Sequence, residues 1–190
     1  FLVLQSSVLI GSLYISLEEL ASYGITIQVT NVIASLASVY YLSYLPKVAY
    51  FRVENNLNKI KEIYFRCLIL FILTFIVGGS ALILFGNWGL HVLKAQTFLL
   101  SNSMIVIILL ITFLEKNHAV AGGFLVTKNE VPYFKAAIIS GISTVIVLFG
   151  LIKIAHLGVW GMILAPGLVQ LAYQNWKWPL VLMRQLNSKE

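Results

Sequence analysis

Aspartate is absent from this 190-residue chain, and all seven of its acidic residues are glutamates. This absence excludes catalytic pairs of aspartates, and nucleotide sites that need an aspartate ligand, within these residues. The sequence also lacks the GxxxxGK[ST] phosphate-binding loop, the HExxH zinc motif and any Cys/His cluster with zinc spacing. We therefore expect neither an enzyme nor an ATP-driven pump, with no catalytic residues, no metal site and no cofactor.

Charged residues and cysteine are scarce. Only 11% of the residues are charged, against about a quarter in soluble domains, and 59% are hydrophobic. The single cysteine, Cys67, cannot form an intramolecular disulfide, and packing is its expected role. A net charge of +6 could suggest a nucleic-acid partner, but the basic residues fall between apolar runs and not on a polar face. The composition predicts a membrane protein with no nucleic-acid partner.

Long apolar runs such as CLILFILTFIVGGSALILFG reach the length that crosses a hydrocarbon core about 30 Å thick. Only helices satisfy their own backbone groups in lipid, so we predict an all-α, polytopic membrane protein with six transmembrane helices. The predicted spans cover residues 1–17, 24–45, 64–86, 98–127, 134–153 and 157–176. Because the first span lacks an initiating methionine and looks clipped, we expect the chain to be a fragment of a longer protein.

Basic residues predict the orientation of the spans. Residues 46–63 mix apolar and basic side chains at helical spacing, which predicts a separate amphipathic segment on the cytoplasmic surface, attracted to anionic membrane lipid. With six spans, eleven Lys and Arg residues fall on one side of the membrane, and only Lys94 and Lys153 fall on the other. The cytoplasmic side carries the excess of basic residues, so both ends of this segment are expected in the cytoplasm.

A lysine between two tryptophans follows the last span, in QNWKWP. Trp176, Lys177 and Trp178 are predicted membrane-interface anchors, because indole rings suit the headgroup level and a lysine reaches lipid phosphates. Pro179 is expected to interrupt the helix as it leaves the bilayer. The alternative is that Lys177 contacts the phosphate of a substrate.

Polar residues within the spans are candidates for a substrate pathway. Gln28, Asn31, Ser35 and Ser38 are three, four and three residues apart, which places them along one helix face. Gln170 lies in the last span on a different side from its small residues. Such polar faces either join helices by hydrogen bonds or line a watery cavity. The pathway candidates are therefore Gln28, Asn31, Ser35 and Gln170.

Glu115 and His118 are the ionisable residues of greatest interest. If the fourth span stopped at Leu114, Glu115 would be a boundary charge, but no proline separates it from the following apolar residues. A continuous helix would place Glu115 and His118 on one face within the membrane, where ionisable residues are usually functional. Their expected role is ion or proton coupling, and the alternative is a structural charge pair that includes Lys116.

Three stretches resemble the C-terminal half of bacterial polysaccharide and O-antigen flippases. They are GNWGLHVLKAQTFLL, FLEKNHAVAGGFLVTKNEVPYFKAAIISG and QLAYQNWKWP, and the resemblance covers nearly the whole chain. Its most specific parts are residues 129–132 and 176–179. These flippases belong to the multidrug/oligosaccharidyl-lipid/polysaccharide exporter superfamily.

The resemblance implies one six-helix lobe of a two-lobe exporter in the bacterial inner membrane, with the N-terminal lobe of the same protein as its missing partner. It implies a lipid-linked oligosaccharide substrate, carried on undecaprenyl pyrophosphate and moved by alternating access. The alternatives are a cation-coupled multidrug exporter of the same superfamily and a membrane assembly subunit that transports nothing. The chain departs from what a pyrophosphate needs, because no Arg or Lys lies near the middle of a predicted span.

Overall fold

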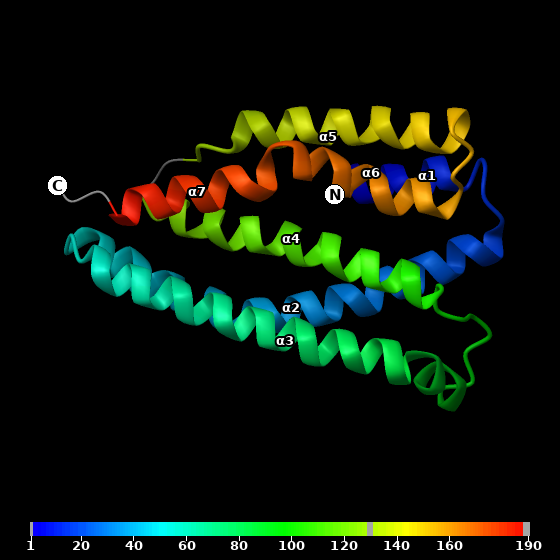
Figure 1. Ribbon diagram of the computed structural model, residues 1–190, viewed down its shortest axis with the longest axis horizontal. Helices are drawn as coiled ribbons and strands as arrows, with labels where there is room; N and C mark the ends of the chain where they lie inside the picture. The colour runs from blue at the N-terminus through cyan, green and yellow to red at the C-terminus, as the bar shows by residue number, and fades with distance from the viewer. Residues whose placement is uncertain (1, 129–130, 188–190) are drawn as a thin grey trace.

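The computed structural model describes residues 2–128 and 131–187, and all the secondary structure in these ranges is helical. This confirms the all-helical prediction. The helices, drawn in Figure 1, are α1 (Leu2–Gly11), α2 (Leu17–Val53), α3 (Leu57–Val92), α4 (Asn102–Val126), α5 (Phe134–Phe149), the π-helical turn η1 (Gly150–Ile154), α6 (Val159–Ala172) and α7 (Gln174–Asn187).

Four helical segments are long and apolar enough to cross a membrane, which indicates a multi-pass membrane protein. They are α2, α3, α4 and the combined segment Phe134–Ile154. Much of their apolar surface faces outward: on α3, Ile69, Ile76 and Val77 are all more than half exposed. Lipid is the expected solvent for such a surface, because the same side chains would be costly to expose to water. The remaining helices are shorter, with 10 residues in α1 and 14 each in α6 and α7.

The structure differs from the expected surface segment at residues 46–63. α2 continues through Pro46 to Val53, and α3 begins at Leu57, so the two helices form one long hairpin with a three-residue turn. Local side chains set the boundaries: Asn55 has φ +56°, and the side chain of Asn56 accepts a hydrogen bond from the backbone N–H of Lys59. The basic residues therefore lie at the ends of the two long helices.

A second difference concerns the last span. α6 ends at Ala172, Tyr173 leaves the helical conformation with φ −144°, and α7 then continues through Pro179 to Asn187. The helix break thus falls six residues before the proline that was expected to cause it. In contrast, α4 runs without interruption past Glu115 and His118, as predicted.

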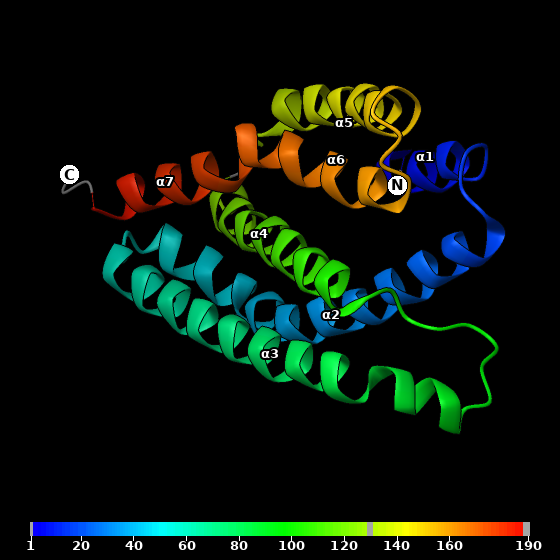
Figure 2. The ribbon, with the colours of Figure 1, turned by 45° about the vertical axis from the view of Figure 1, so that its right-hand side comes forward.

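The helices form two groups with α4 between them. α2 and α3 lie side by side, α1, α5 and α6 gather on the opposite side, and α4 contacts both groups (Figures 1 and 2). Two apolar cores join them. The first core includes Phe71, Ile105, Ile108, Leu148 and Met162. The second core, near the α2–α3 turn, includes Val48, Ile60, Phe124, Leu125, Trp178, Leu182 and Leu186.

Candidate functional site

A cavity of about 560 Å³ lies within the bundle, lined by residues of α1, α2, α4, α5, α6 and α7 and by Tyr133. Its volume falls in the range of about 300–1,000 Å³ that small-molecule sites occupy. Hydrogen-bonding side chains from all these segments reach it. They are Ser7, Tyr23, Asn31, Tyr41, Thr112, Glu115, His118, Tyr133, Ser140, Thr144, Gln170, Gln174 and Trp178.

Two adjacent glycines of α4 shape the wall of the cavity. A Cβ atom on Gly123 would lie 2.8 Å from both Cε2 and Oη of Tyr41, and one on Gly122 would lie 3.2 Å from Cε1 of Tyr133. Ordinary contacts between carbon atoms are about 3.5–4.0 Å. The paired glycines therefore let two tyrosine rings approach the α4 backbone, one from α2 and one from the segment before α5.

A hydrogen bond joins α4 to α7 at the cavity. Nδ1 of His118 lies 2.8 Å from Oδ1 of Asn175, and Asn175 is buried. One residue earlier in α7, Gln174 accepts a hydrogen bond of 3.3 Å from the indole N–H of Trp178. The His118–Asn175 bond holds the start of α7 against α4 directly after the break at Tyr173, and the Gln174–Trp178 bond lies within α7.

Glu115 carries the one formal charge among the described lining residues, with histidine neutral. Its Oε1 lies 3.2 Å from Nζ of the neighbouring Lys116, and the Glu115 side chain is 39% exposed. Lys116 does not line the cavity, and neither does any other described lysine or arginine. The lining is therefore neutral or acidic and presents no cation to a phosphate.

The side-chain oxygen of Gln170 is a hydrogen-bond acceptor without a donor among the described residues. This oxygen, Oε1, is buried. Gln174 lies one turn further along the chain and also lines the cavity. A buried amide oxygen without a partner costs about 1–3 kcal/mol, a cost that a bound hydroxyl or N–H donor would remove.

Of the predicted pathway residues, Asn31 and Gln170 line the cavity, whereas Gln28 and Ser35 are exposed and outside its lining. The α2 residues that reach the cavity are Tyr23, Ile27, Asn31 and Tyr41. At 3.6 residues per turn they fall within an arc of about 80°, and Gln28 and Ser35 lie roughly 40–60° beyond it. The polar face predicted for α2 and the face that lines the cavity are therefore different. They overlap at Asn31, which lies at the edge of both.

Glu115 and His118, the predicted coupling residues, both line the cavity. The predicted interface anchors are placed differently from one another. Trp176 is 48% exposed and Lys177 is half-buried, with its Nζ 5.9 Å from the ring centroid of Tyr173. Trp178 is only 5% exposed, belongs to the second core and lines the cavity, so it does not face lipid.

Several residues of the cavity lining were not predicted from the sequence as pathway residues. Tyr41, Tyr133, Gln174 and Trp178 all reach the cavity. The Gly122–Gly123 pair was one usable signal, since adjacent glycines in a membrane helix indicate close approach by a neighbour. Asn129 and Glu130, within the specific part of the flippase resemblance, lie outside the described residues.

Neither a metal cluster nor a match to known proteins assigns a chemistry to the cavity. Within residues 2–128 and 131–187, no group of three or more His, Cys, Asp or Glu side chains could hold a metal ion. The chain matches no protein-family model, no curated protein and no solved structure. Its function is therefore argued from the cavity itself.

Proposed function

We propose that this chain is one lobe of a two-lobe membrane transporter that moves a lipid-linked oligosaccharide across the bacterial inner membrane. The proposed substrate is an O-antigen or capsular repeat unit on undecaprenyl pyrophosphate, and the proposed mechanism is alternating access. The observation that carries this proposal is the cavity, which combines a hydrogen-bonding lining that is neutral apart from Glu115 with aromatic rings inside a bundle of apolar helices.

The lining suits a sugar head group. Sugar hydroxyls both donate and accept hydrogen bonds, and the lining offers amides, hydroxyls and phenols that do the same. The buried Oε1 of Gln170, which has no partner among the described residues, supplies an acceptor for a substrate hydroxyl. Tyr41, Tyr133 and Trp178 add apolar ring surface on which the carbon face of a sugar ring can pack.

The proposal includes six spans with both ends in the cytoplasm. The four long apolar segments supply four of them. The proposal assigns the remaining two to the region of α1, which packs on α5 and α6, and to the α6–α7 segment. The N-terminal lobe of the same protein would then face this one, and the pyrophosphate would be held by that lobe or by the basic residues at the cytoplasmic rim.

A cation-coupled drug exporter is the second candidate, and Glu115 is the observation that favours it. A carboxylate in the lining of a cavity attracts cationic drugs, and Glu115 is such a carboxylate. Its neighbour Lys116 offsets part of this charge, because the two groups lie 3.2 Å apart. A scaffold that transports nothing is less well supported, since it has no need for a cavity with a buried amide oxygen that lacks a partner among the described residues.

Surface polysaccharide in a deletion strain complemented with each variant tests the flippase proposal. Gln170→Ala removes an acceptor from the cavity, and the lost hydrogen bond of about 0.5–1.5 kcal/mol corresponds to a transport rate lowered roughly 2- to 12-fold. Gln28→Ala is the matched control, because Gln28 is an exposed glutamine outside the lining. Unchanged polysaccharide in the deletion strain itself would refute the proposal.

Glu115→Gln separates the two transporter candidates. A drug exporter that binds cations through this carboxylate should lose its ability to lower the intracellular level of a lipophilic cation such as ethidium. A flippase should leave ethidium accumulation unchanged. If Glu115 couples transport to protons, the same variant should also change how polysaccharide export depends on pH, and unchanged export across pH would remove that coupling role alone.

A further inference from the structure

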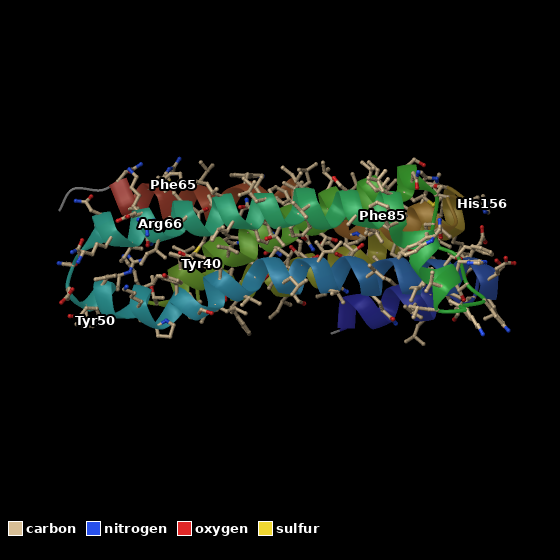
Figure 3. The ribbon with its side chains drawn as sticks, turned by 90° about the horizontal axis from the view of Figure 1, so that it is seen from below. Tyr40, Tyr50, Phe65, Arg66, Phe85 and His156 are labelled. Carbon is tan, nitrogen blue, oxygen red and sulfur yellow. The ribbon has the colours of Figure 1, made fainter. Side chains whose placement is uncertain are left out.

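The end of the α2–α3 hairpin concentrates basic residues. We call residues 47–66 the hairpin tip, which contains two acidic residues, Glu54 and Glu62, and five basic ones: Lys47, Arg52, Lys59, Lys61 and Arg66. The helices have 37 and 36 residues, so each is about 55 Å long, whereas the hydrocarbon layer is about 30 Å thick. The tip therefore reaches the headgroup level, at the end where Figure 3 places Tyr50 and Arg66.

Three of these five basic side chains are already engaged within the protein. Arg52 donates hydrogen bonds to the carbonyl oxygen of Phe124 and the hydroxyl of Thr127 at the end of α4. Lys61 donates to Oδ1 of Asn187 at 2.8 Å. Arg66 pairs locally with Glu62, and the other acidic residue, Glu54, accepts a hydrogen bond from the hydroxyl of Tyr50.

Lys47 and Lys59 remain without a carboxylate partner among the described residues, and they border the same aromatic ring. Their Nζ atoms lie 5.9 and 4.8 Å from the ring centroid of Phe51, and Nζ of Lys47 also lies 5.8 Å from the ring of Tyr44. Both lysines are exposed, whereas Phe51 is 7% exposed and packs in the second core. A fixed ring thus gathers two ammonium groups, one from each helix, at the surface.

We propose that Lys47 and Lys59, gathered by Phe51, bind the phosphate of an anionic phospholipid in the leaflet that surrounds the hairpin tip. A phosphate accepts hydrogen bonds from ammonium groups, and its negative charge would offset the repulsion between the two lysines. A lipid is favoured over a soluble anion because the outer surface of α2 leading to the site is apolar. Leu36, which precedes Lys47 by eleven residues and so lies within about 20° of it around the helix, is 62% exposed there and offers contact to acyl chains.

Lipid binding to the protein purified in detergent tests this site. Native mass spectrometry would compare binding of phosphatidylglycerol with that of phosphatidylcholine to the wild type and to Lys47→Gln and Lys59→Gln. A lysine near an anionic surface contributes about a fivefold gain in binding, so each variant should bind phosphatidylglycerol about fivefold more weakly. Binding of phosphatidylcholine should not change.

Lys128→Gln is the matched control, because Lys128 is exposed at the same end of the molecule and follows the residue that Arg52 contacts. The proposal requires that phosphatidylglycerol binding fall less than twofold in this variant. Equal losses of phosphatidylglycerol binding in all three variants would mean diffuse attraction by surface charge and would overturn the site. Unchanged binding in either Lys47→Gln or Lys59→Gln would also overturn it. Displacement of phosphatidylglycerol by millimolar inorganic phosphate would overturn the lipid assignment, because a soluble anion would then suffice.

Discussion

Gly123→Ala tests whether close packing between Tyr41 and α4 shapes the cavity. The new Cβ would lie 2.8 Å from two atoms of Tyr41, so the ring would have to move by about 0.7–1.2 Å to restore ordinary contact. Overpacking of this kind costs about 1–3 kcal/mol. Replacing glycine by alanine within a helix also gains about 1 kcal/mol from helix propensity, which opposes this cost.

Gly24→Ala isolates the cost of the contact. Gly24 lies within α2, and a Cβ there would meet nothing within 4 Å, so this variant should show the propensity gain alone. Gly123→Ala should therefore be less stable than Gly24→Ala by about 1–3 kcal/mol. For a chain of this length the corresponding difference in Tm is about 2–4 °C per kcal/mol.

The single cysteine provides the assay. Cys67 is 2% exposed, so a thiol-reactive fluorescent dye should report its exposure as the detergent-solubilised protein unfolds on heating. A second substitution, Tyr41→Ala, removes the ring that the new Cβ would strike, so in that background Gly123→Ala should behave like Gly24→Ala. If Gly123→Ala raised Tm as much as Gly24→Ala with Tyr41 in place, the close approach described here would be refuted.

Two further predictions concern α7. Trp178→Ala should lower the free energy of unfolding by about 3–5 kcal/mol because Trp178 is buried in the second core. Trp176→Ala should lower it far less because Trp176 is 48% exposed. Similar shifts in Tm for the two variants would contradict this placement. His118→Ala should lower the free energy of unfolding by about 1–3 kcal/mol because it leaves the buried Asn175 unpaired, and Asn175→Ala should lower it less because His118 is only partly buried. The double variant should cost less than the sum, and strict additivity in a double-mutant cycle would argue against this bond.

The helical class and the four long apolar segments could be predicted from sequence because both follow from local properties. A run of about twenty apolar residues has the length of the hydrocarbon layer wherever it occurs in a chain. Helix starts are also local: the side chain of Ser16 accepts from the backbone N–H of Glu19, which places the start of α2 at Leu17. The uninterrupted course of α4 past Glu115 likewise followed from the lack of a proline.

The orientation of each helix about its axis could not be predicted in the same way. A rotation of about 40–60° separates Gln28 and Ser35, which lie outside the cavity lining, from the α2 face that reaches it. A polar stripe in one sequence does not say which neighbour it faces, because that depends on packing against helices distant in the chain. Tyr41 lines the cavity because Gly123, eighty-two positions later, leaves room for its ring.

The helices continue through Pro46 and Pro179 for the same physical reason, which lies in the second core. α2 continues past Pro46 because Val48 and Phe51 beyond it are buried there, and α7 continues past Pro179 because Leu182 and Leu186 are buried there. A proline removes one backbone hydrogen bond and adds a steric clash, at about 3 kcal/mol, and each fully buried apolar side chain recovers about 1.5–3 kcal/mol. Tertiary packing therefore outweighs the local signal at both positions.

The second core also connects the position of α7 to the cavity. Trp178 belongs both to this core and to the cavity lining, so the core borders the cavity. A displacement of α7 from α4 would break the bond between His118 and Asn175 and expose Trp178 to the cavity side. The hydrogen bond of His118 and the burial of Trp178 are therefore coupled through the position of α7, so weakening either contact should weaken the other.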